Sequence, residues 1–271
     1  MFLNFILVLA VVCAAVFMLL TGWTTAWYHI LVFIGMYIVF VVLGVIGYAG
    51  FLFLWSLFLD KKKEVNRVSR FYSLIVRETM IMLLFFSRAR VHIEGKEKLP
   101  KDTKFLLVAN HRSNYDPITS VVKFGRNDMI FVSKPENFNI PIAGAFMHKA
   151  GFIPIDRDNP KNALVTINKG AEYLKNQEAS VGIFPEGTRN RTDATLLEFK
   201  NGAFKIATKA QVPIVVVAMK NMEQVKKNFP WKSTRVSAKI VDVITKEEVM
   251  ASNTAELSRR AREAMLTYLE S

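Results

Sequence analysis

The sequence predicts an α/β fold: a mostly parallel sheet with flanking helices, preceded by an N-terminal membrane helical hairpin. Two observations lead to this prediction. Residues 2–59 contain no Asp, Glu, Lys or Arg, whereas from Arg88 onward short apolar runs alternate with segments of helical length. Such alternation implies crossover connections and therefore a largely parallel sheet. We accordingly expect a membrane-anchoring hairpin at 1–60, an amphipathic interfacial helix at 61–90 and an α/β domain at 91–271.

The uncharged N-terminal part contains two apolar runs. Phe2–Leu20 is long enough to cross a bilayer core, which requires about 20 apolar residues, and it lacks the basic start of a signal peptide. Ile30–Leu59 exceeds a straight span, so we expect it to tilt or to lie partly in the interface. Four glycines give this second run a small-residue face that could pack on the first: Gly35, Gly44, Gly47 and Gly50.

The membrane orientation follows from Lys61-Lys62-Lys63, which ends the second run. The positive-inside rule places this end, and the α/β domain after it, on the cytoplasmic side of the membrane. Two spans would return the N-terminus to the same side. A hairpin buried in one leaflet is the alternative. Glu64–Ser87 then shows apolar residues at helical spacing, and this helix could either lie on the membrane or seal the domain.

The remainder of the chain alternates between strands and helices without a repeat or a low-complexity linker, which indicates one domain. The expected strands are 91–93, 105–109, 129–132, 152–155, 180–184, 214–219 and 235–244. The expected helices are 117–124, 141–149, 162–176, 202–210 and 254–269.

The net charge of +13 belongs to the part that follows the apolar runs. A basic domain next to a membrane segment suits anionic headgroups and phosphorylated substrates. Nucleic acid, the other common partner of basic chains, is not expected for a membrane-tethered domain. Cys13 is the only cysteine, so no intramolecular disulfide can form; this is consistent with a reducing compartment.

The first polar cluster, Asn110–Pro117, follows an expected strand and precedes an expected helix. It contains His111 and, five residues later, Asp116. A histidine is a suitable general base near neutral pH, and a carboxylate on its far nitrogen fixes the tautomer and stabilises the imidazolium. A capped turn without catalytic function is the alternative for this pair.

Further polar residues follow other expected strands, and strand ends of a parallel sheet share one edge. Phe184–Arg191 contains Gly187, which permits a tight turn, and Arg189, whose guanidinium suits a phosphate. Asp156-Arg157 ends another strand, and Lys200 precedes an expected helix start, where anions bind well. Taken alone, these could be a solvated loop, a local ion pair and an exposed lysine.

Together the clusters fit a reaction on a phosphorylated substrate, and the membrane segment suggests a lipid. No Gly-x-Ser-x-Gly turn is present, so a histidine that activates the hydroxyl of the substrate is favoured over a covalent nucleophile. The sequence contains neither a His-x-x-x-His nor a Cys-x-x-Cys spacing, so no metal site is indicated. The other histidines are expected to be structural or interfacial: His29, His92 and His148.

Four ordered blocks resemble the glycerolipid acyltransferase family, most closely the 1-acyl-sn-glycerol-3-phosphate acyltransferases. Asn110–Pro117 matches the His-x4-Asp block, and Phe184–Arg191 matches the Phe-Pro-Glu-Gly-Thr-Arg block. Gly151–Arg157 and Val212–Ile214 resemble the second and fourth blocks. The fourth block often carries a second proline, where this chain has Val216 or Val217, which puts detail of the acyl tunnel in doubt. The first and third blocks together are highly specific.

The resemblance implies roles for individual residues. His111 would take the proton from the acceptor hydroxyl, and Asp116 would orient it and support its positive charge. Arg189, with Arg157 and Lys200, would hold the acceptor phosphate. Three loop residues would complete the substrate-binding set by shaping the loop, with a direct glycerol contact possible for the first of them: Glu186, Gly187 and Thr188.

The implied activity is transfer of a fatty acyl group from acyl-coenzyme A or acyl carrier protein to the sn-2 hydroxyl of lysophosphatidic acid, giving phosphatidic acid. The thioester is a co-substrate, and no cofactor or metal is implied. Glycerol 3-phosphate or another lysophospholipid is the alternative acceptor. Two other classes remain for comparison, namely a lipid phosphohydrolase or esterase and a catalytically silent lipid-binding module.

Overall fold

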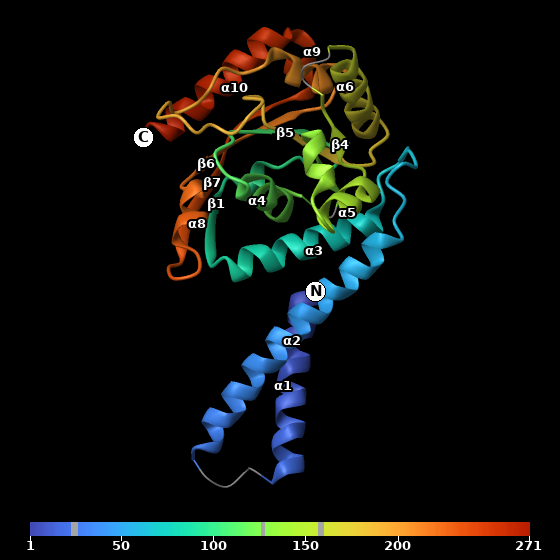
Figure 1. Ribbon diagram of the computed structural model, residues 1–271. Helices are drawn as coiled ribbons and strands as arrows, with labels where there is room; N and C mark the ends of the chain where they lie inside the picture. Colours follow the sequence, from blue (N-terminus) through green and yellow to red (C-terminus); the bar gives the residue numbers. More distant parts are fainter. Residues whose placement is uncertain (23–26, 126–127, 157–159) are drawn as a thin grey trace. The chain divides into compact units, whose positions relative to one another are not determined.

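The computed structural model describes residues 1–22, 27–125, 128–156 and 160–271 (Figure 1). The chain divides into two compact units, Met1–Asp60 and Lys61–Ser271. The first is a pair of apolar helices and the second is an α/β unit that contains the polar clusters.

The first unit consists of α1 (Phe2–Thr21) and α2 (His29–Leu57), and both are long and apolar enough to cross a membrane. The buried residues of α1 recur every three or four positions and so form one stripe: Leu3, Ile6, Ala10, Ala14 and Met18. Gly44 brings α2 close to this stripe, because a Cβ there would lie 2.8 Å from Cγ2 of Ile6. The predicted packing role is wrong for the other three glycines, which have no atom within 4 Å of a Cβ position: Gly35, Gly47 and Gly50.

The second unit is built on one sheet, in which seven strands of the described residues have the order β1-β7-β6-β2-β5-β3-β4. The strands are β1 (Ala89–Glu94), β2 (Leu106–Ala109), β3 (Met129–Ser133), β4 (Ile153–Pro154), β5 (Ser180–Ile183), β6 (Ile214–Lys220) and β7 (Thr234–Ile244). Strands β2 to β6 are mutually parallel, whereas β7 runs antiparallel to β6 and parallel to β1. The prediction of a mostly parallel sheet is therefore confirmed.

Helices cover both faces of this sheet (Figure 1). One layer contains α3 (Arg70–Phe86), α4 (Tyr115–Phe124) and α5 (Ala143–Ala150), and the other contains α6 (Pro160–Lys175), α7 (Lys205–Ala210) and α10 (Thr254–Leu269). Shorter elements connect them: η1 (Lys96–Lys98), η2 (Pro135–Asn139), η3 (Asn201–Phe204), α8 (Met222–Asn228) and α9 (Lys246–Ala251). Between the layers, β2, β5 and β6 are almost wholly buried, so the core lies around the centre of the sheet.

Two expected helices differ from the structure. The helix expected from Glu64 begins only at Arg70, because Ser69 caps it by accepting a hydrogen bond from the Tyr72 N–H. The chain before it has no regular secondary structure and is held by side chains of the second unit, for example by Glu178, which accepts from the Val68 N–H at 2.9 Å. The helix expected over 202–210 is divided into η3 and α7.

Candidate active site

The first polar cluster lies in the turn between β2 and α4, at the edge of the sheet where the parallel strands end. Here the structure brings His111 and Asp116 together, with His111 Nδ1 2.8 Å from Asp116 Oδ2. The same carboxylate oxygen accepts the backbone N–H groups of Arg112 and Ser113, both at 2.7 Å. Asp116 is therefore fixed by the turn that carries His111.

The two side chains differ in their access to solvent. The Asp116 side chain is 1% exposed, whereas that of His111 is 18% exposed. Burial raises the pKa of the Asp116 carboxyl, while His111 and the two backbone N–H groups oppose that shift. A proton on Nδ1 that is donated to the carboxylate leaves Nε2 as the acceptor nitrogen of the ring. Such an arrangement is chemically suited to a histidine that accepts a proton at Nε2 while a carboxylate orients its ring.

An aromatic stack supports the His111 ring. Phe184, directly after β5, lies parallel to it with ring centroids 4.1 Å apart and an interplanar angle of 13°. Phe131 of β3 stacks on Phe184 in turn, at 5.2 Å. The Phe131 ring covers Gly182, where a Cβ would lie 2.2 Å from ring atom Cζ. The absence of a side chain at Gly182 thus allows the stack to form.

Glu186 ties the loop after β5 to the histidine turn. It is 4% exposed, and its two oxygens accept the backbone N–H groups of His111 at 2.6 Å and of Leu197 at 3.0 Å. Burial raises the pKa of the Glu186 carboxyl, against these two hydrogen bonds. The Asn190 N–H closes the junction by donating to the His111 carbonyl at 2.7 Å. In this structure Glu186 is a positioning residue, and its expected contact with glycerol stays a prediction.

Arg189 lies beside the same turn, because its Nη1 donates to Asn114 Oδ1 at 2.7 Å. Gly187 makes the loop possible with a φ of +75°, a conformation that other residues rarely adopt. Thr188 is exposed next to it. The Lys200 N–H donates to the Pro185 carbonyl at 2.8 Å, so its exposed side chain belongs to the border of this loop.

Arg157, expected to hold phosphate, lies outside the described residues. Its neighbour Asp156 follows β4 at the edge where β2 and β5 also end. Within the described ranges, no group of three or more His, Cys, Asp or Glu side chains could hold a metal ion.

Two side chains that fix the turn, those of Asn110 and Arg112, are not among the predicted site residues. The buried Asn110 amide pairs with the Met219 backbone at the end of β6, donating to its carbonyl at 2.9 Å and accepting from its N–H at 2.7 Å. Arg112 donates to the carbonyls of Ala194 at 3.1 Å and Thr192 at 3.4 Å, and so holds the following loop. These hydrogen bonds join residues that are 80 or more positions apart in the sequence, so no local sequence pattern predicts them.

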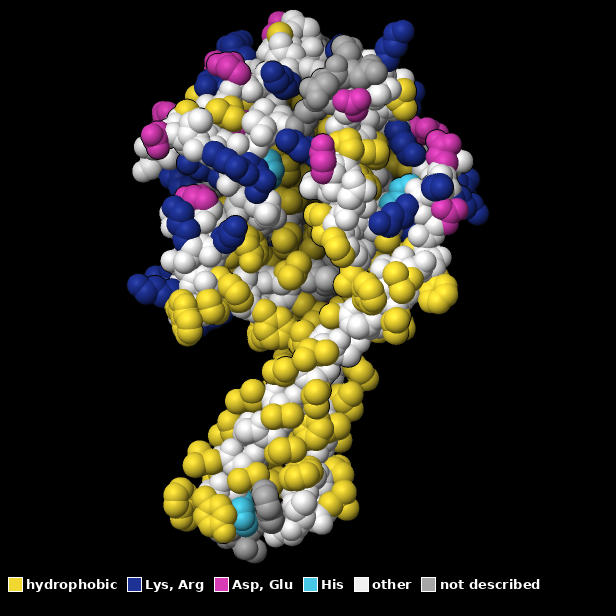
Figure 2. Space-filling view, viewed as in Figure 1, with side chains coloured by type: hydrophobic (Ala, Val, Ile, Leu, Met, Phe, Trp, Pro, Cys, Tyr) yellow, Lys and Arg dark blue, Asp and Glu magenta, His cyan; other side chains and the backbone are white. Residues whose placement is uncertain are grey.

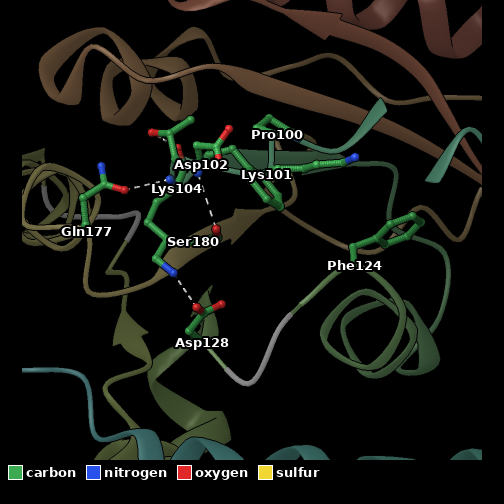
Figure 3. Close-up of a pocket in the computed structure, with 10 residues that line it drawn as sticks. Pro100, Lys101, Asp102, Lys104, Phe124, Asp128, Gln177 and Ser180 are labelled. Carbon is green, nitrogen blue, oxygen red and sulfur yellow. Dashed lines mark hydrogen bonds and ion pairs between the residues drawn. The ribbon is translucent and has the colours of Figure 1, made fainter. Parts of the chain in front are cut away.

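A cavity of about 280 Å³ lies at the opposite edge, where β2, β3 and β5 begin (Figure 3). Its polar groups already pair with one another. The Lys104 ammonium contacts Asp128, the Lys104 N–H donates to Gln177 at 3.0 Å, and Ser180 accepts from the Phe105 N–H. This cavity contains none of the expected site residues and is separate from the histidine turn.

Several known proteins resemble this chain in sequence or in fold. Residues 90–220 match the family model described as Acyltransferase. The 1-acyl-sn-glycerol-3-phosphate acyltransferase alpha of Ovis aries is 30% identical over 71% of this chain and 67% of its own length. The 1-acyl-sn-glycerol-3-phosphate acyltransferase of Saccharomyces cerevisiae is 30% identical over 66% of this chain and 60% of its own. The crystal structure of the 1-acyl-sn-glycerophosphate (LPA) acyltransferase PlsC of Thermotoga maritima is similar with a TM-score of 0.63, at 26% identity, over 82% of this chain and 87% of that one.

Proposed function

This chain belongs to the acyltransferase family, and from that premise we propose that it transfers a fatty acyl group from an acyl thioester to the sn-2 hydroxyl of lysophosphatidic acid. The product would be phosphatidic acid. The observation that carries the proposal is the His111–Asp116 pair, held by four hydrogen bonds in a turn that Arg189 also contacts. A candidate base and a candidate phosphate-binding cation thus come from two neighbouring loops that contact each other.

In the proposed reaction, His111 Nε2 removes the proton from the acceptor hydroxyl as its oxygen attacks the thioester carbonyl. Asp116 stabilises the imidazolium that forms. The tetrahedral intermediate then collapses, the carbon–sulfur bond breaks, and the departing thiolate takes the proton from His111. The acyl group has moved from sulfur to oxygen, and the histidine is neutral again. Coenzyme A or acyl carrier protein would be the thiol, and no cofactor is required.

The acceptor would be held by its phosphate. Arg189 offers a fork of donors that matches phosphate oxygens, and Arg157 and Lys200 would add positive charge. Gly187 and Thr188 would bring the backbone of this loop near the headgroup, while Glu186 fixes the loop. Figure 2 shows hydrophobic side chains within a hollow on one face of the second unit, with basic side chains on both sides. Such a surface suits a lipid with an apolar chain and an anionic head.

The two apolar N-terminal helices associate the chain with a membrane, which is where its substrate would reside. We propose that the α/β unit works on the cytoplasmic side, because Lys61-Lys62-Lys63 follows three residues after α2 ends.

Acyl transfer by the detergent-purified chain tests the proposal. Acyl-coenzyme A, and in a second series acyl carrier protein thioester, would be supplied with lysophosphatidic acid, glycerol 3-phosphate or lysophosphatidylcholine. We expect product from lysophosphatidic acid, lost in His111→Ala and kept in His92→Ala, whose imidazole is largely exposed on β1. Product from only one of the other acceptors would identify that acceptor, and not lysophosphatidic acid, as the substrate. Full turnover by a folded His111→Ala variant would overturn the assignment of His111 as the base.

A further inference from the structure

An exposed aromatic surface lies where α3 ends and the loop after α8 turns back into β7. It consists of Phe85, Phe86, Phe229 and Trp231, which are 54%, 38%, 49% and 84% exposed. We call it, together with the neighbouring Lys226, Lys227 and Lys232, the aromatic–basic patch. All of its residues belong to the second unit, and none takes part in the proposed chemistry.

Arg88 holds the two halves of the patch together. Its Nη1 donates to the carbonyls of Pro230 and Trp231, both at 3.2 Å, and its own carbonyl accepts from the Thr234 N–H at 3.2 Å. Figure 1 shows the loop after α8 beside the C-terminal end of α3, and Figure 2, in the same view, shows hydrophobic and basic side chains at this place. The aromatic rings are thus presented together by a hydrogen-bonded scaffold.

The charge of the patch is uniformly positive. Lys226, Lys227 and Lys232 are exposed, and their ammonium groups have no ion pair in the part of the chain that the structure describes. The one carboxylate of α8, Glu223, lies 3.9 Å from Arg112 at the other end of that helix. Three lysines without a neutralising acid favour an anionic partner.

We propose that the aromatic–basic patch inserts its rings into the headgroup region of an anionic bilayer and so gives the second unit a membrane contact of its own. Tryptophan and phenylalanine settle at membrane–water interfaces, and adjacent lysines are attracted to anionic lipids. Lysine is depleted in protein–protein interfaces, which favours a bilayer over a protein partner. This inference does not depend on which acyl acceptor the chain uses.

Trp231 is itself the reporter for a test, because the other tryptophans all lie in the apolar N-terminal part: Trp23, Trp27 and Trp55. Replacing these three with Phe in the full chain leaves Trp231 as the sole emitter. The chain would be reconstituted into vesicles of phosphatidylcholine with phosphatidylglycerol, with and without brominated acyl chains. We expect emission at a shorter wavelength than in water, loss of intensity with brominated lipid, and weak quenching by aqueous iodide.

The matched control moves the tryptophan to another exposed apolar position of the same unit. In the same background, Trp231→Phe combined with Met250→Trp places it on α9, which lies far from the patch (Figure 1). Its emission should stay at the aqueous wavelength and be quenched by iodide. Equal emission and quenching of the two tryptophans would overturn the proposal. Emission of Trp231 at the aqueous wavelength would also overturn it and would favour a protein as the partner of the patch.

The basic half of the patch is tested separately. The triple variant Lys226→Gln, Lys227→Gln, Lys232→Gln should lose part of the quenching of Trp231 by brominated lipid, and the residual quenching should no longer depend on salt. Unchanged quenching with unchanged salt dependence would overturn the lysine contribution. Circular dichroism and retained acyl transfer in detergent show that each variant is folded.

Discussion

Glu186 and Arg189 lie three residues apart in one loop, and their surroundings give them different tasks. Both oxygens of Glu186 accept backbone N–H groups inside the protein, whereas the Arg189 guanidinium contacts Asn114 at the surface. The sequence predicts a substrate-binding role for both residues. The structure distinguishes the two residues. Both oxygens of Glu186 are already hydrogen-bonded to backbone N–H groups, so we expect this carboxylate to contribute mainly to stability.

For Glu186→Ala we expect a loss of unfolding free energy of about 2 kcal/mol or more, because two N–H groups lose their acceptors in a buried place. Acyl transfer should fall with it, since the His111 backbone is released. Thermal unfolding in detergent, compared with wild type, measures the first effect. An unchanged midpoint would mean that the loop does not need this tether.

For Arg189→Ala we expect a change in unfolding free energy below about 0.5 kcal/mol, as is usual for surface substitutions. The KM for lysophosphatidic acid should rise by roughly tenfold or more, because a charge-assisted phosphate contact is lost. The KM for a monoacylglycerol acceptor is the internal reference. A rise of equal size for both acceptors would remove Arg189 from the phosphate site.

Because the pKa of the Asp116 carboxyl is raised in the folded chain, we expect the free energy of unfolding to depend on pH. Because burial raises its pKa in the folded chain, the folded state binds this proton more tightly than the unfolded state. Its stabilising contribution is complete below the ordinary aspartate pKa of about 3.9 and is lost as pH rises through the folded value. Wild type should therefore lose stability relative to Asp116→Asn between acid and neutral pH. Unfolding midpoints of both proteins across that range measure this.

The same Asp116→Asn substitution should reduce kcat by on the order of 10³-fold, since an amide can hold the wrong tautomer of His111. The two effects of the substitution therefore have opposite signs. As pH rises from acid to neutral, the variant should gain stability relative to wild type, whereas its turnover should be lower than that of wild type. A uniformly unstable, inactive variant would instead show that the carboxylate is needed for folding.

At the scale of elements, the aromatic stack links the sheet to the histidine turn. Gly182→Ala would place a Cβ within 2.5 Å of three Phe131 ring atoms, so the ring must move, and Phe184 and His111 with it. We expect a destabilisation of about 1–3 kcal/mol, as for other overpacked cores, together with a lower kcat. Gly202→Ala is the control, because no atom lies within 4 Å of its Cβ position. Similar effects at both glycines would contradict the packing argument.

The long, strongly patterned elements are predicted from the sequence because burial on one side imposes a period. Short elements are not: α8 and α9 have seven and six residues, too few to show helical spacing. The start of α9 nonetheless carries a readable signal, since Thr245 and Glu248 form a capping box. Nothing local predicts that β7 inserts between β1 and β6, because that placement is decided by packing across the whole sheet.

In the candidate site, too, short-range contacts are predicted from the sequence and long-range contacts are not. The His111–Asp116 contact joins residues five apart, so one turn suffices to form it, and the sequence predicts it. The contacts of Glu186 with His111 and of Asn110 with Met219 join residues 75 and 109 apart, and only the folded sheet brings them together. Residue types indicate which side chains are polar and near strand ends. Which of them face a substrate and which face the backbone is settled by tertiary structure.

For the whole molecule, the division of charge is the dominant feature. Residues 2–59 carry no Asp, Glu, Lys or Arg, whereas the net charge of +13 arises from residues 60–271, nearly all of them in the α/β unit. This division suits a first unit that lies in hydrocarbon and a second unit that lies in water beside lipid headgroups. The basic side chains beside the hollow in Figure 2 and the aromatic–basic patch both belong to the second unit.

This division leads to a prediction about membrane topology. Helix α1, with 20 residues at about 1.5 Å each, is long enough to cross a bilayer core, and α2 with 29 residues would cross it with a tilt. The turn at Tyr28 and the lysines at Lys61 should then lie on opposite sides of the membrane. Cys13→Ser removes the only natural thiol, and Tyr28→Cys or Lys61→Cys adds one at either end of α2.

An impermeant maleimide, applied to intact bacterial cells that express each variant, should modify Tyr28→Cys and leave Lys61→Cys unmodified. Inverted membrane vesicles should give the reverse result. Modification of Tyr28→Cys from neither side would place the turn in the bilayer and favour a hairpin in one leaflet. In that arrangement both helices would enter and leave on the cytoplasmic face, and the aromatic–basic patch would share a single membrane surface with the whole of the anchor.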